Sequence, residues 1–265
     1  MKAAFFLFFF FFSVLSLSAQ RFAFEPGILD FHVEPGTTQT QAVRITNSSE
    51  KTIAFQAYIN DWLRDSTGGH NYFRPDTLKR SCASWISLNK NFIEVPPNTT
   101  EEILVTMHGP INPGQFTKMK WAMLFIQTAE EKDSAAKKSK EVKTEIKELM
   151  RAGIHIYQTP SQVTNAAARV DYLISTEDTT NTFIFGVKNI GDVMLQCKST
   201  LALTNIENGQ EYKLDKIEFP MFPDGNRAIK FKSNNIPKGK YSALAILDYG
   251  EDNELQAIEK SVEIK

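Results

Sequence analysis

Short segments in which apolar and polar residues alternate recur along most of the chain. In residues 40–47, TQAVRITN, and 52–62, TIAFQAYINDW, the apolar side chains fall at every second position. Similar segments occupy 84–95 and 101–110, and the turn-forming residues PPNTT at 96–100 separate them. Strands of this kind, recurring about every dozen residues with turns between them, are typical of a β-sandwich.

A second series of strand-like segments begins after Pro160. Residues 161–169, SQVTNAAAR, are small and polar and are the best candidate for a joint between domains. About seven strand-like segments follow within about a hundred residues, separated by turns such as ENG at 207–209. We therefore predict an all-β protein with two immunoglobulin-like β-sandwich domains, at residues 21–160 and 161–265.

The stretch from 114 to 160 departs from this regular spacing. An apolar segment, KWAMLFIQT at 120–128, reads as a buried strand, and a Lys/Glu-rich loop follows at 129–149. Connections longer than about 12–15 residues are usually functional or disordered. The apolar positions of the charged loop fit a short amphipathic helix as well as a disordered loop, and the thin apolar stripe favours disorder or a marginal helix over a stable one. We expect the function to lie in this loop and in the strand after it.

The strand after the loop, MRAGIHIYQTP at 150–160, is the candidate binding element. Its side chains alternate, with Met150, Ala152, Ile154 and Ile156 on one face and Arg151, His155 and Tyr157 on the other. A strand at a sheet edge offers unpaired N–H and C=O groups to a strand of a partner. The alternative is that Ile154 and Ile156 simply face the core of their own domain. The candidate partner-binding residues are Met150, Ala152, Ile154, His155, Ile156 and Tyr157.

The first twenty residues predict export rather than structure. Lys2 supplies a positive charge, residues 5–17 are almost entirely apolar, and Leu-Ser-Ala at 17–19 offers a cleavage site. Residues 1–20 therefore read as a cleaved signal peptide, with an uncleaved anchor as the alternative. No later segment is long and apolar enough to span a bilayer. We expect a soluble periplasmic protein, with an extracellular or cell-surface location as the alternative.

Composition and motifs argue against several classes of function. The net charge of −1 gives no general attraction to nucleic acid. The four histidines are scattered without ligand spacing, and no nucleophile elbow, zinc-protease motif, phosphate-binding loop or dinucleotide fingerprint occurs. Asp61 and Asp65 flank Trp62 and Arg64, but two carboxylates in a loop are usually solvated or structural. We therefore expect no enzyme, and no catalytic residue, metal or cofactor.

The two cysteines, Cys82 and Cys197, fall in different predicted domains. Export would permit a disulfide between them. Two separate buried thiols are the favoured interpretation, because lone cysteines are commonly buried as small hydrophobic residues. For Trp62, Trp85 and Trp121, which lie in strand-like segments, packing is favoured over a sugar-stacking surface.

The order of these signals resembles the PapD-like family of periplasmic chaperones. The resemblance is carried by residues 45–62, by 81–106 with its Pro-Pro turn, by 114–160 and by NIGDVMLQCKSTLAL at 189–203. It implies two immunoglobulin-like domains set in an L. It also implies a long loop between the sixth and seventh strands of the first domain, with the seventh strand leading through a proline into the second domain.

The chain departs from the family at two positions that matter for binding. In the fimbrial members, an arginine in the first strand and a lysine in the seventh hold the carboxylate of the bound subunit. Here residues 24–28, FEPGI, contain no arginine, and His155 stands at the lysine position. The resemblance therefore implies a binding strand without the paired cations.

The first hypothesis is a non-enzymatic periplasmic chaperone or assembly factor. It would bind an extended segment of an exported or outer-membrane protein by β-strand addition at residues 150–157. The alternative is a structural scaffold or interaction subunit of a bacterial envelope complex. Transient binding to several unfolded clients would favour the first hypothesis, and permanent stoichiometric association with one complex would favour the second.

Overall fold

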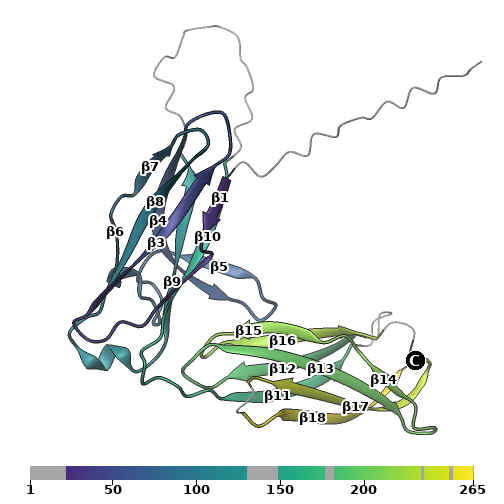
Figure 1. Cartoon of the computed structure of the whole chain (residues 1–265). Coiled ribbons are helices and arrows are strands. Elements are labelled where there is room, and N and C mark those ends of the chain that lie inside the picture. Colours follow the sequence, from purple (N-terminus) through teal and green to yellow (C-terminus); the bar gives the residue numbers. More distant parts are fainter. Residues whose placement is uncertain (1–21, 130–148, 177–181, 234–235, 251–252, 265) are drawn as a thin grey trace, which may run out of the picture.

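The computed structural model describes residues 22–129, 149–176, 182–233, 236–250 and 253–264. They form two β-sandwiches whose long axes lie at a large angle, so the molecule has the shape of an L (Figure 1). The expected signal peptide and almost all of the charged loop lie outside the described residues. Within the described ranges, no helix is long and apolar enough to cross a membrane.

Two sheets form the first sandwich. One has the strand order β1-β3-β8-β6, and the other has the order β2-β10-β9-β4-β5, with β7 paired to β4. The strands are β1 Phe22–Glu25, β2 Ile28–Phe31, β3 Thr38–Asn47, β4 Ile53–Arg64, β5 His70–Phe73, β6 Ile86–Leu88, β7 Phe92–Val95, β8 Thr99–His108, β9 Lys120–Thr128 and β10 Arg151–Gln158. Two 3₁₀ turns join them, η1 Ala83–Trp85 and η2 Pro113–Phe116.

The alternation seen in the sequence sets the core of the first sandwich. β3 buries Val43 and Ile45 completely and leaves Arg44 exposed between them. β8 likewise buries Ile103 and Val105 completely and leaves the residue between them exposed. Because successive side chains of a strand point to opposite faces, each sheet delivers one apolar face to a shared interior.

The first strand region divides between the two sheets. β1 pairs antiparallel with β3, and β2 pairs in parallel with β10. The chain crosses from one sheet to the other at Pro26 and Gly27. Proline has no N–H with which to continue a ladder, so the change of partner falls at a residue that cannot extend β1. This crossing decides how much of β10 remains open.

The second sandwich is built in the same way. Its sheets have the orders β11-β12-β16 and β14-β13-β17-β18, with β15 paired to β13. The strands are β11 Ala168–Ser175, β12 Thr182–Asn189, β13 Leu195–Asn205, β14 Glu211–Lys213, β15 Ile217–Met221, β16 Asn226–Lys232, β17 Gly239–Asp248 and β18 Gln256–Ile264. Phe183, Phe185, Phe231 and Tyr241 are buried in its core. The prediction of an all-β protein with two immunoglobulin-like sandwiches is confirmed.

An asparagine holds an equivalent turn in each sandwich. Asn47, at the end of β3, is fully buried, and its amide donates to the carbonyls of Lys51 (2.8 Å) and Val95 (2.9 Å). Asn189, at the end of β12, is also fully buried and donates to the carbonyl of Met221 (2.8 Å). Each asparagine satisfies backbone groups that the turn would otherwise leave unpaired.

The predictions for single buried residues are confirmed. Cys82 and Cys197 are separate free thiols, both buried. Burial raises the pKa of the Cys197 thiol to about 12 and also raises the pKa of Cys82, so neither is poised to react. Asp61 is fully buried and accepts hydrogen bonds from Leu78 N (2.8 Å) and Ser81 Oγ (2.6 Å). It therefore holds the loop after β5, which is a structural role.

Candidate partner-binding edge

β10 lies between two neighbours of unequal length. Its whole length pairs antiparallel with β9. On the other side, β2 pairs with it in parallel only from His155 onward, beginning opposite Ile28. Within the described part of the chain, no strand pairs with residues 151–154 on that side. The first half of β10 is therefore an open sheet edge, which follows directly after Leu149 and Met150.

Two hydrogen bonds show which backbone groups face this opening. The carbonyl of Met150 accepts from the last residue of β9 (2.9 Å), so even-numbered residues bond toward β9. The N–H of His155 donates to Gly27 O (3.1 Å), so odd-numbered residues bond toward β2. Because the direction alternates along a strand, Arg151 and Gly153 present their N–H and C=O groups to the open side. A partner strand would find its backbone hydrogen bonds there.

The expectation that the whole candidate segment lies at a sheet edge is wrong for its second half. His155, Ile156 and Tyr157 already pair with β2, opposite Ile28, Leu29 and Asp30. The sequence pattern predicts a strand but not the length of its second neighbour. The strand-addition hypothesis is therefore confined to residues 150–154.

The two faces of β10 have different surroundings. Ile154 (1% exposed) and Ile156 (0%) belong to the core of the first sandwich, so the alternative that they face their own domain is confirmed. On the same face, nearer the open end, Met150 is 38% exposed and Ala152 is half-buried. Of the even-numbered candidates, Met150 and Ala152 remain accessible to a partner.

The opposite face of the open half carries an aromatic platform that we define as Tyr72, Phe125 and Arg151. The guanidinium of Arg151 lies 4.6 Å from the ring centroid of Phe125 and 5.6 Å from that of Tyr72. The two rings meet edge to face at 5.0 Å. Beside them, a Cβ at Gly153 would lie only 3.0 Å from Met123 Sδ, so glycine fits the strand closely against β9.

Sequence reasoning missed this platform because it predicted no strand between Trp62 and residue 84. Residues 65–69, which end in two glycines, join β4 to β5 as a hairpin, with Arg64 paired to His70. Two glycines between segments with aromatic residues are a hairpin signal. Recognising it would have placed Tyr72 on the same sheet as Trp62.

Below the platform, two histidines meet on the same face of the sheet. His155 Nε2 lies 3.4 Å from His70 Nε2, and Arg64 Nη2 lies 3.2 Å from that same nitrogen. The Trp62 ring packs against both imidazoles, with centroids 4.9 Å from His70 and 4.8 Å from His155. Tyr157 follows on β10, and burial raises the pKa of its phenol to about 12. These candidate residues are thus packed among rings rather than presented to a partner.

The second sandwich covers the lower part of this face. A junction cluster of apolar side chains joins the two sandwiches, and it comprises Trp62, Met119, Trp121, Met123, Phe125, Tyr157 and Phe222. Phe222 follows β15 and enters the cluster from the second sandwich, with its ring 4.9 Å from the Trp62 ring and 5.2 Å from the Trp121 ring. Met194, also of the second sandwich, packs against the cluster and is partly buried. The packing role predicted for the three tryptophans is confirmed, although Trp62 and Trp121 pack between the sandwiches rather than inside one.

Polar contacts reinforce the junction cluster. Arg80 donates from Nε (2.9 Å) and Nη2 (2.6 Å) to one carboxylate oxygen of Asp224. Met119 N donates to Asp192 O (3.1 Å), and a backbone bond of 2.8 Å runs from Ala228 of β16 to the β4–β5 hairpin. Among the described residues, no group of three or more His, Cys, Asp or Glu side chains could hold a metal ion.

Comparison with known proteins bears on the fold. No family model matches the chain, and no curated protein matches its sequence. A chain from a chaperone–tip adhesin complex of CFA/I fimbriae covers 91% of this chain and 98% of its own length, with a TM-score of 0.50 and 12% identity. The class 5 fimbrial chaperone CfaA covers the same shares (TM-score 0.48, 13% identity). The Pseudomonas aeruginosa CupB2 chaperone covers 91% and 100% (TM-score 0.45, 13% identity).

The similarity to the chain from the CFA/I complex extends over both sandwiches and defines the class of the fold. The protein has the two-sandwich fold of the PapD-like chaperones. The sequence resemblance to that family is thereby confirmed as a resemblance of fold.

Proposed function

We propose that this protein is a non-enzymatic chaperone or assembly factor of the bacterial periplasm. It binds an extended segment of an exported or outer-membrane protein by adding that segment as a strand beside β10. One observation carries the proposal: β9 covers the whole of β10, whereas β2 leaves residues 151–154 unpaired on the other side. The fold supports it, because a structure that shares this fold comes from a fimbrial chaperone–tip adhesin complex.

The edge offers a binding mode that depends little on the sequence of the partner. Backbone groups of Arg151 and Gly153 supply hydrogen bonds, as in other cases where a peptide extends a sheet. Met150 and Ala152 offer apolar contact on one face, and the aromatic platform offers it on the other. A partner segment with alternating apolar residues fits both faces, which is the pattern of a strand that has not yet found its own sheet.

Proline at an outward-facing amide tests the proposal. Arg151→Pro removes an N–H that points to the open side, and proline is tolerated at sheet edges where that side faces solvent. Partner capture should fall at least tenfold, measured by a photo-cross-linker at residue 149 in the bacterium and quantified for the main cross-linked protein. Arg151→Ala is the matched control, because it removes the same guanidinium but keeps the N–H.

Two outcomes would contradict strand addition at this edge. One is that the proline and alanine variants both remain folded and capture the partner as well as the original protein does. The other is loss of capture in both variants, which would assign binding to the guanidinium instead. Permanent one-to-one recovery with a single envelope complex would favour the scaffold alternative over the chaperone.

A further inference from the structure

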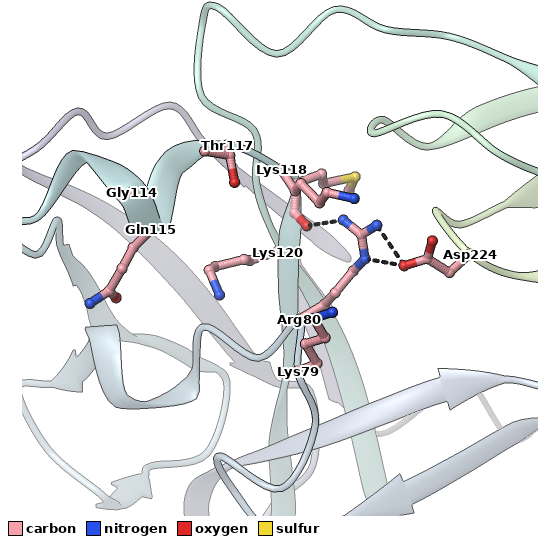
Figure 2. Close-up of a pocket in the computed structure, with 9 residues that line it drawn as sticks. Lys79, Arg80, Gly114, Gln115, Thr117, Lys118, Lys120 and Asp224 are labelled. Carbon is pink, nitrogen blue, oxygen red and sulfur yellow. Dashed lines mark hydrogen bonds and ion pairs between the residues drawn. The ribbon is translucent and has the colours of Figure 1, made fainter.

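A cavity of about 280 Å³ lies where the first sandwich meets Asp224 of the second (Figure 2). Its walls come from the loop before η1, from η2 and from the start of β9. Among the described residues, four cationic ones line it, Lys79, Arg80, Lys118 and Lys120, against one acidic residue, Asp224. Its lining therefore carries a strong excess of positive charge, in a protein whose overall charge is −1.

Two of these cations are already neutralised. The Arg80 side chain, only 9% exposed, is paired with Asp224. Lys118 Nζ lies 3.2 Å from a carboxylate oxygen of Asp192. In the described part of the chain, no ion pair joins Lys79 or Lys120 to a carboxylate. Their charge is thus available to a ligand in the cavity.

The surroundings of Lys120 favour an added anion. Its ammonium is half-buried, 5.3 Å from the centroid of the Trp85 ring, and its hydrogen bond to Ser81 O is long, at 3.4 Å. Burial, with the nearby positive charge of Arg80, lowers its pKa. An ammonium has three donors, so this one keeps unused hydrogen-bonding capacity in a place that penalises an uncompensated charge.

We propose that this cavity binds an oxyanion, a carboxylate or phosphate group, bonded by Lys120 and attracted by the nearby charge of Lys79. The amide of Gln115 and the ammonium of Lys120 reach into the same open space, so a neutral donor stands beside the charged one (Figure 2). Charge-assisted hydrogen bonds of this kind are shorter and stronger than neutral ones. The site goes beyond the proposed chaperone function, since it lies at the start of β9, whereas the open edge borders the end of that strand.

The anion has two sources that share this chemistry, a free ion and the acidic side chains of a bound polypeptide. Isothermal titration of the full mature chain at low ionic strength, with inorganic phosphate in one arm and hexaglutamate in the other, distinguishes them. We expect saturable binding of one ligand per chain in at least one arm. Phosphate binding identifies a free ion, and binding of hexaglutamate alone identifies an acidic segment.

Variants that remove a positive charge and a variant that removes the negative charge should change the affinity for the anion in opposite directions. Lys79→Gln and Lys120→Gln should each weaken binding by about fivefold, as expected for loss of one charge contact. Asp224→Asn should strengthen it by a similar factor, because it removes the carboxylate that faces these cations and releases Arg80. The double variant Lys51→Gln/Lys238→Gln, which removes two exposed lysines outside the cavity, is the matched control and should bind as the original protein does.

Absence of saturable binding in both arms would overturn the proposal, as would equal weakening by the control. Lys79 is exposed, so its variant reports on the site even where Lys120→Gln perturbs folding. Arg151→Pro should leave anion binding unchanged, so failure of the strand-addition proposal and failure of the anion site are separate results.

Discussion

His70 and His155 lie in contact, and the surroundings of both imidazoles disfavour the protonated form. Burial lowers the pKa of His155 to about 4, and the positive charges of His70 and Arg64 act in the same direction. Burial and Arg64 also lower the pKa of His70, and Asp65 opposes them only in part. Both rings are therefore neutral near pH 7, when they pack against Trp62 beside the contact between the sandwiches.

We predict that stability falls as the pH drops from about 6.5 to about 4. The unfolded chain takes up a proton on His155 near its ordinary pKa of 6.5, whereas the folded chain resists until about 4, so acid favours unfolding across this window. The difference in the pKa of His155 between the folded and unfolded chain limits the loss of stability to about 3 kcal/mol. Partial exposure of the ring reduces the expected loss to about 1–2 kcal/mol. Urea unfolding at a series of pH values measures it.

His155→Gln separates this effect from the titration of carboxylates. Glutamine carries no proton in this range, so the variant should lose less stability between pH 6.5 and 4.5 than the original protein does. Identical pH profiles for the two proteins would show that His155 does not contribute.

β10 shows which parts of an element the sequence can predict. The two-residue alternation correctly assigns Ile154 and Ile156 to one face, because that information lies within the strand itself. The pairing with β2 depends on a segment more than a hundred residues earlier and on the crossing at Pro26 and Gly27. No local pattern encodes such a contact, so the extent of the open edge could only be read from the structure.

The open edge predicts a distinctive pattern of hydrogen exchange in the protein without a partner. Amides of Ala152 and Ile154 point toward β9 and should be protected, as should His155, which donates to Gly27. Amides of Arg151 and Gly153 point to the open side and should exchange at least tenfold faster relative to their intrinsic rates. NMR measurement of individual amides tests the alternation.

A partner strand should then protect Arg151 and Gly153 and leave the other amides little changed. Protection of Gly153 equal to that of Ile154 in the free protein would mean that the edge is already covered. The proposed function requires that the N–H groups of Arg151 and Gly153 point to an open side of the sheet, so this result would contradict it.

The arrangement of the two sandwiches rests on contacts that composition and spacing did not reveal. The sequence predicted two sandwiches from repeated strands and turns, since each strand carries its own pattern. Arg80 and Asp224 are 144 positions apart, and neither stands out in its local sequence. The same holds for Phe222, which closes the junction cluster from a turn of the second sandwich. Such contacts set the position of one sandwich relative to the other, and with it the shape of the cavity and of the face beside β10.

Phe222→Ala should uncouple the sandwiches without unfolding either one. Its ring is 6% exposed and belongs to the junction cluster, not to the core of the second sandwich. Losing it should cost about 3 kcal/mol, as for a buried phenylalanine, and the cost falls on the contact between the sandwiches. Calorimetry should then resolve two transitions in place of one, and tryptophan emission should shift to the red because Trp62 and Trp121 gain access to water.

Phe219→Ala is the matched control, because Phe219 is equally buried (5% exposed) but lies in the core of the second sandwich. It should lower the stability of that sandwich and leave the emission of Trp62 and Trp121 unchanged while the protein is folded. Trp85 lies in the core of the first sandwich and gives a constant background in both variants. Unchanged emission and a single unshifted transition in Phe222→Ala would mean that the polar contacts, led by Arg80 and Asp224, hold the L by themselves.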